Sequence, residues 1–186
     1  MLDVVLKVGP KTLPETEFQV NARVLIRADL NVPIYNGKVL DTSRIRALNA
    51  TLDQWRLHPI IVMSHFVRPI SDTDPSTSLR QVLSVCQKEW GQEILFASSL
   101  DEAKIANVCP GQIMLLENLR YHPGEETNDP SFAKQLAELG DIYVNDAFSC
   151  SHRSHASIEA ITRFLPSFPG VHFQAEAEPV KQTGVI

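Results

Sequence analysis

The stretch VLIRADLNVP at residues 24–33 joins a short apolar run directly to a polar segment that carries charged residues. Three further stretches repeat the pattern, namely IIVMSHFVRP at 60–69, IMLLENLRYHP at 113–123 and IYVNDAFSCSHRSH at 142–155. Apolar runs of this length are typical of strands buried in a parallel sheet. The polar segments would then all leave the sheet beyond the carboxyl ends of its strands, where open α/β sheets bind ligands.

Helix-like stretches separate these strands. Apolar residues at helical spacing predict helices over about 41–56, 79–90, 99–106 and 130–140, and another that follows the last clear strand (141–148) and runs to about 163. Residues 93–97 add a strand, and the pair Asn36-Gly37 predicts a two-residue hairpin. The alternation predicts an α/β fold, a Rossmann-like three-layer αβα sandwich with a mostly parallel sheet. The tail from residue 166 is weakly patterned.

Composition limits the class of protein. The 186 residues suit one domain with a full core, and the net charge of −5, from 17 basic and 22 acidic residues, argues against a nucleic-acid or membrane-surface protein. The three scattered cysteines suggest no disulfide framework. We find no pattern of a signal peptide and no apolar stretch long enough to span a bilayer, so we expect a cytoplasmic protein.

Basic side chains gather at the predicted sheet edge. Arg68, Arg120 and Arg153 follow the apolar runs closely, and Arg44 lies in the first turn of a predicted helix that begins near the same edge. Guanidinium groups bind carboxylate and phosphate oxygens in a bidentate fork. His65 and His152 add donors, while Asp29 and Asn31 suit a ligand hydroxyl. The set predicts a small ligand with a carboxylate, a hydroxyl and a phosphate.

The same four stretches resemble the signature segments of the phosphoglycerate kinase family, in order and in spacing, and the resemblance extends over about residues 16–178. It implies a two-domain, hinge-bending enzyme of glycolysis that transfers a phosphoryl group between 1,3-bisphosphoglycerate and ADP. In that family the N-terminal domain binds 3-phosphoglycerate and the C-terminal domain binds the magnesium nucleotide. Segment 170–180 resembles the start of the helix that leads toward the hinge.

The resemblance also implies roles for individual residues. Arg44 would stabilise the charge of the transferring phosphoryl group and is the expected catalytic residue. Asp29 and Asn31 would contact the hydroxyl and carboxylate region of the substrate. The remaining residues would hold or flank its phosphate: His65, Arg68, Arg120, Arg153 and His152. The family usually has glycine where Val67 stands, so the backbone before Arg68 is expected to be altered or tolerant of a side chain.

The family's nucleotide-binding domain has no counterpart in residues 1–186. We therefore expect the chain to be the N-terminal substrate-binding domain, a cut chain with half of an active site and no activity alone. Mg-ATP or Mg-ADP would bind the absent domain, and no cofactor is expected on this chain. The expected partners are 3-phosphoglycerate or 1,3-bisphosphoglycerate and the absent domain, with no nucleic acid and no membrane, and the expected state is a monomer.

Other interpretations remain open. The chain could be a stand-alone module that binds phosphate-sugar acids without catalysis, or a folded domain that is inert when separated. Cys150, His152 and His155 lie close in sequence, but a structural zinc site needs four ligands, so we predict no metal. Glu125 and Glu126 are expected to cap or solvate the turn before Asn128.

Overall fold

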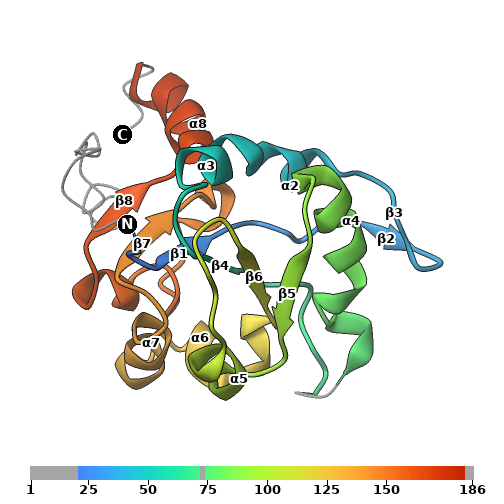
Figure 1. Cartoon of the computed structure of the whole chain (residues 1–186), viewed down its shortest axis with the longest axis horizontal. Coiled ribbons are helices and arrows are strands. Elements are labelled where there is room, and N and C mark those ends of the chain that lie inside the picture. The colour runs from blue at the N-terminus through green and yellow to red at the C-terminus, as the bar shows by residue number, and fades with distance from the viewer. Residues whose placement is uncertain (1–20, 72–73, 183–186) are drawn as a thin grey trace.

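The computed structural model describes residues 21–71 and 74–182 (Figure 1). The N-terminal segment 1–20, in which no signal peptide was expected, lies outside the described residues. Within the described part, no helix combines the length and the apolar content that crossing a bilayer requires.

A six-stranded sheet forms the centre of the fold, with every pair of neighbouring strands parallel. The strands, in spatial order, are β5 (Ile94–Ala97), β6 (Ile113–Leu116), β4 (Ile60–Met63), β1 (Val24–Arg27), β7 (Ile142–Asn145) and β8 (Ser167–Pro169). The register aligns Arg27 at the end of β1 with Met63 and Asn145 at the ends of its neighbours. The segments that follow β1, β4 and β7 therefore start at one level.

Helices cover both faces of the sheet, as Figure 1 shows. Along β1, Val24 and Ile26 belong to one buried cluster, whereas Leu25 belongs to the other. The first cluster includes side chains from α2 (Ser43–Ala47), α3 (Asn49–Gln54) and α4 (Arg80–Trp90). The second includes side chains from α5 (Leu100–Ile105) and α7 (Pro130–Ala137). Two cores on opposite faces of one sheet confirm the predicted three-layer αβα sandwich.

The hairpin is also confirmed. Strands β2 (Ile34–Tyr35) and β3 (Lys38–Val39) pair antiparallel, and Asn36 and Gly37 have φ angles of 47° and 71°. Two successive positive φ angles define the turn that Asn-Gly favours, because its twist matches that of the strands. This hairpin lies apart from the main sheet.

Three predicted elements were wrong in detail. The helix expected over 41–56 is divided at Leu48 into α2 and α3. The helix expected to run to 163 is replaced by irregular chain with two short 3₁₀ turns, η3 (Phe148–Cys150) and η4 (Ala160–Arg163). The segment 141–148 is not the last strand, because β8 follows it at the sheet edge and ends in a proline. An edge strand accepts proline because one of its sides forms no ladder.

The remaining elements connect or flank these layers. They are the 3₁₀ turns η1 (Pro75–Thr77) and η2 (Leu119–Tyr121), the short helix α6 (Pro123–Glu126) and the long helix α8 (Val171–Gln182). Gly170, just before α8, lies so close to Asp146 that a β-carbon there would overlap the carboxylate. Thr51 and the backbone N–H of Phe173 both donate to this buried carboxylate, which ties the start of α8 to the end of β7.

Candidate functional site

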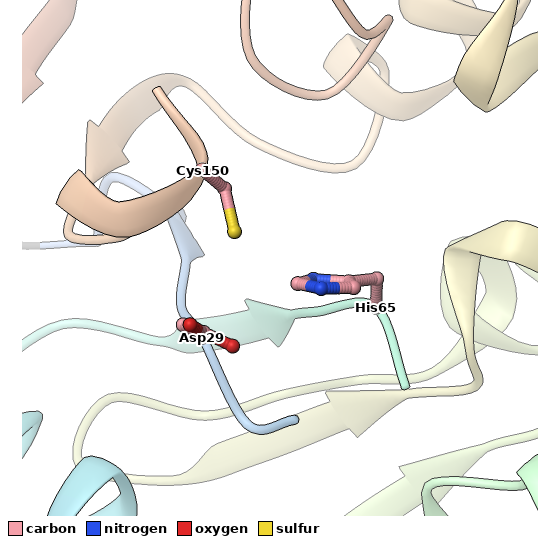
Figure 2. A group of neighbouring side chains, drawn as sticks. All are labelled: Asp29, His65 and Cys150. Carbon is pink, nitrogen blue, oxygen red and sulfur yellow. The ribbon is translucent and has the colours of Figure 1, made fainter. Parts of the chain in front are cut away.

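Asp29, His65 and Cys150 meet beyond the carboxyl ends of β1, β4 and β7. Figure 2 shows their side chains pointing toward one another, and one potential ligand atom from each lies within 4.8 Å of the other two. His65 and Cys150 are buried, and Asp29 is half-buried. The parallel register brings these three residues together although up to 121 positions separate them in the sequence.

Asp29 is the acceptor at the centre of this group. Its Oδ2 accepts hydrogen bonds from Arg44 Nη1 and from Ser149 Oγ, each 2.7 Å long, and its Oδ1 accepts from the backbone N–H of Asn31. Burial alone would raise the pKa of Asp29, but the hydrogen bond from Ser149 and the neighbouring positive charge lower it overall. Asp29 is therefore a carboxylate at neutral pH.

Asn31 joins the segment after β1 to the segment after β4. Its side-chain oxygen accepts a hydrogen bond of 3.0 Å from the backbone N–H of Val67, and its carbonyl oxygen accepts from Arg44 Nη1 at 3.1 Å. Val67 has a φ of 49°, a left-handed conformation that glycine adopts without steric cost. The side chain is thus tolerated at this position in a backbone conformation that suits the family's usual glycine.

His65 is held by a residue that the sequence analysis did not single out. Arg27, the last residue of β1, is buried, and its Nη2 lies 3.1 Å from His65 Nδ1. Burial, together with the charge of Arg27, lowers the pKa of His65 to about 3. His65 is therefore neutral at physiological pH. Arg27 is the one charged residue in the strand β1, which is otherwise apolar and is buried on both faces. Buried arginines are rare unless they are paired, so its position in the sequence could have indicated a buried polar partner.

Arg68 and Arg120 share one counter-ion. Arg68 Nη2 lies 2.7 Å from Glu126 Oε2, and Arg120 Nε lies 3.4 Å from Glu126 Oε1. Arg120 also donates from Nη1 to the carbonyl oxygen of Val67. Arg68 is 77% exposed and Arg120 only 11% exposed, so Arg120 is the more firmly placed of the two. The expectation that Glu126 caps or solvates a turn was wrong, because its carboxylate pairs with these arginines.

Glu125 was also wrongly expected to cap or solvate the turn. It is fully buried, and its carboxylate accepts hydrogen bonds from the backbone N–H and the hydroxyl of Ser157, at 3.0 and 2.6 Å. His155 Nδ1 lies 3.8 Å from the same carboxylate. Burial of an ionised carboxylate is costly without such donors, so Ser157 compensates for the absence of water.

Arg153 and His152 differ in their surroundings. Arg153 is half-buried and close enough to His65 and Arg120 to lower the pKa of both groups. Its guanidinium makes no hydrogen bond or ion pair with the described residues. His152 is exposed, and no hydrogen bond to the described part of the chain joins it to the group around His65.

The cluster of Asp29, His65 and Cys150 supplies three types of metal ligand, whereas the three residues Cys150, His152 and His155 do not form such a group among the described residues. Two features oppose a cation there. Asp29 is already paired with Arg44, and the positive charges of Arg27 and Arg120 act on His65. The electrostatics of this site favour an anion.

A Rossmann-like parallel αβα domain, with guanidinium groups gathered at the carboxyl edge of its sheet, belongs to the class of α/β domains that bind small anions at that edge. A family model described as phosphoglycerate kinase matches residues 16–184. The chain belongs to the phosphoglycerate kinase family.

Individual relatives agree with this assignment. The phosphoglycerate kinase of Rhodospirillum centenum is 48% identical over 161 residues, which cover 83% of this chain and 41% of the relative. That of Bartonella quintana is 43% identical over 180 residues, which cover 94% of this chain and 45% of the relative. This chain therefore spans less than half the length of these curated relatives.

Solved structures give the same result. The phosphoglycerate kinase of Coxiella burnetii has a TM-score of 0.77 at 34% identity, and the match covers 85% of this chain and 41% of that protein. The enzyme of Pyrococcus horikoshii has the same TM-score at 26% identity and is covered to 42%.

Proposed function

We propose that this chain is a substrate-binding domain of phosphoglycerate kinase type, which binds 3-phosphoglycerate at the carboxyl edge of its sheet. The observation that carries the proposal is the half-buried Arg153 guanidinium, which has no protein counter-ion among the described residues and lies near His65 and Arg120. A cation kept without a partner at such an edge is suited to a phosphate from outside the protein.

The roles of the side chains follow from their bonds. Arg153, Arg120 and Arg68 bind the phosphate. Arg120 and Arg68 give up part of their ion pairing with Glu126 when they do so. Neutral His65 donates a hydrogen bond, and His152 flanks the pocket from an exposed position. Asp29 accepts from the substrate hydroxyl. Asn31 uses its side-chain oxygen on Val67, so its amide nitrogen is the atom that faces the substrate's oxygens in this proposal.

In a protein that carries both halves, the proposed reaction is the reversible transfer of a phosphoryl group between 1,3-bisphosphoglycerate and ADP, which gives 3-phosphoglycerate and ATP. Such a transfer depends mainly on positioning and charge stabilisation. Arg44, which Asp29 holds at the edge of the site, is the proposed group that stabilises the transferring charge.

The nucleotide and its Mg²⁺ are assigned to the other half. The carboxylates at this edge already have partners: Arg44 pairs with Asp29, and Arg68 and Arg120 pair with Glu126. They are poorly suited to Mg²⁺, which is usually held by one or two carboxylates that are free to coordinate it and which keeps several water ligands. We therefore propose that this chain alone catalyses no phosphoryl transfer. From its composition we also propose that it acts as a cytoplasmic monomer without nucleic-acid or membrane partners.

Calorimetric titration of 3-phosphoglycerate into the chain tests the binding function. Saturable heat supports the proposal, and its absence would favour the inert-domain interpretation. Incubation with ATP and 3-phosphoglycerate tests the second part, and turnover by a pure preparation would contradict the assignment of half a site. The stand-alone binding module is distinguished by the source gene, since glycine-rich nucleotide loops encoded beyond Ile186 would exclude it.

A further inference from the structure

A continuous series of hydrogen bonds runs under the site from a buried carboxylate to His65. Glu125 Oε1 accepts from Ser157 Oγ at 2.6 Å, and Ser157 Oγ accepts from Arg27 Nε at 2.9 Å. Arg27 Nη2 lies 3.1 Å from His65 Nδ1. All four residues are buried, with exposed fractions between 0% and 5%. The series joins α6, the segment after η3, β1 and the segment after β4.

The donors and acceptors in this series have only one consistent arrangement. The carboxylate oxygens of Glu125 accept both the backbone N–H and the hydroxyl proton of Ser157. The Ser157 hydroxyl then has only lone pairs left, and these meet the Nε–H of Arg27. A guanidinium group only donates. His65 Nδ1 must therefore be an acceptor, and the single proton of the neutral ring is on Nε2.

We propose that Glu125, Ser157 and Arg27 are positioning residues that fix His65 as its neutral Nε2–H tautomer, so that the ring donates one hydrogen bond to the bound oxyanion. The nature of that anion rests on the function proposed above, whereas the tautomer does not. A neutral donor keeps its hydrogen bond through the physiological pH range, which an imidazolium of ordinary pKa would not.

The groups that face His65 agree with this role. The charged or titratable neighbours are Arg27, Asp29, Arg120, Arg153 and Cys150. Three of these are cations, and together with burial they keep the ring neutral although Asp29 acts in the opposite direction. The same tautomer opposes metal binding, because a metal would need the Nε2 lone pair and would leave a proton on Nδ1 facing the Arg27 donor.

Long-range ¹H–¹⁵N correlation NMR of the histidine rings, without ligand, reads the tautomer directly. The chain has six histidines, and a His65→Gln variant identifies the signals of His65 because it lacks that one set. We expect His65 to show Nε2–H alone between about pH 5 and pH 8. An Nδ1–H ring, or a ring that titrates near the ordinary value, would overturn the proposal.

Variants then test the positioning residues. Ser157→Ala removes the link between Glu125 and Arg27, so we expect a measurable population of the Nδ1–H tautomer, and Ser157→Thr should restore the wild-type spectrum. Ser154→Ala, at an exposed serine of the same segment, is the control and should change nothing. A folded Ser157→Ala variant with the wild-type tautomer would contradict the role of the series.

The two proposals fail separately. If Ser157→Ala does not fold, as far-ultraviolet circular dichroism would reveal, the wild-type spectrum and the Ser157→Thr variant still decide the tautomer. If 3-phosphoglycerate gives no calorimetric heat while His65 shows Nε2–H alone, the proposed function fails and the positioning role remains.

Discussion

The side-chain oxygen of Asn31 lies 3.0 Å from the backbone nitrogen of Val67 and holds this residue at a φ of 49°. The bond joins the segments that follow β1 and β4, both of which contribute to the proposed anion site. A β-branched residue is strained in this region of backbone space, by about 1–2 kcal/mol. The geometry of these two segments therefore lowers the stability of the protein, because it requires a strained backbone at Val67.

Replacing Val67 with glycine should stabilise the protein. Relief of the strain is offset in part by the larger entropy of glycine in the unfolded chain, about 0.5–1 kcal/mol, so we expect a net gain of roughly 0.5–1 kcal/mol and a Tm higher by about 1–4 °C. Differential scanning calorimetry measures the change. Asn36→Gly is the matched control, because asparagine tolerates a positive φ and little strain remains to be relieved. A lower Tm for Val67→Gly would contradict the argument.

The free energy of unfolding should fall as the pH is lowered, because His65 stays neutral in the folded protein. Its pKa is about 3 in the folded protein, whereas an unfolded chain has an ordinary value near 6.5. As the pH falls below the unfolded value, the unfolded state gains a proton that the folded state does not bind, and folding is disfavoured until the folded ring is protonated in turn. From about pH 7.5 to about pH 5 the loss amounts to roughly 2 kcal/mol.

Urea unfolding at a series of pH values measures this effect. The His65→Gln variant lacks the titrating group, so the difference between the wild-type and variant free energies of unfolding should change with pH by that amount. Parallel pH profiles for the two proteins would show that His65 has an ordinary pKa.

Gly170→Ala should destabilise the protein, because the new β-carbon would overlap the Asp146 carboxylate. That carboxylate cannot move away without breaking its bonds to Thr51 and to the backbone of Phe173. Overpacking of this kind costs about 1–3 kcal/mol. Chemical denaturation measures the loss, and a cost of only a few tenths of a kcal/mol would show that α8 shifts freely relative to β7.

Arg153→Ala should weaken 3-phosphoglycerate binding by about 10-fold to 100-fold, the usual value of a hydrogen bond to a charged group. Isothermal titration calorimetry measures the affinity. Arg46→Ala is the control, since Arg46 is 61% exposed and, within the described part of the chain, its guanidinium forms a long ion pair of 3.9 Å with Glu89. Equal losses in the two variants would mean that the overall charge, and not the position of Arg153, determines binding.

The sheet, and the edge at which the candidate side chains meet, were predictable because both depend on local patterns. Buried runs at 24–27, 60–63 and 142–145 are strands, and parallel pairing then places Asp29, His65 and Cys150 at one edge whatever the details of the connections. The hairpin was predictable for a similar reason, since two adjacent residues determine its turn.

The errors concern features decided by distant partners. Glu125 occupies a polar turn in the sequence, yet Ser157, 32 positions away, supplies the hydrogen bonds that permit its burial. The same serine holds Arg27, which the sequence alone presents only as a charged residue at the end of a strand. Strand β8 is short and ends in proline, so its pairing with β7, not its composition, defines it.

The carboxylate of Glu126, shared between Arg68 and Arg120, gives the site an internal competitor. An incoming anion can bind Arg68 and Arg120 only if it attracts their guanidinium groups more strongly than the Glu126 carboxylate does. A dianionic phosphate attracts two guanidinium groups more strongly than a single carboxylate does, because it carries more charge and more acceptor oxygens. At the proposed site, competition with Glu126 would therefore favour ligands of higher negative charge over singly charged anions.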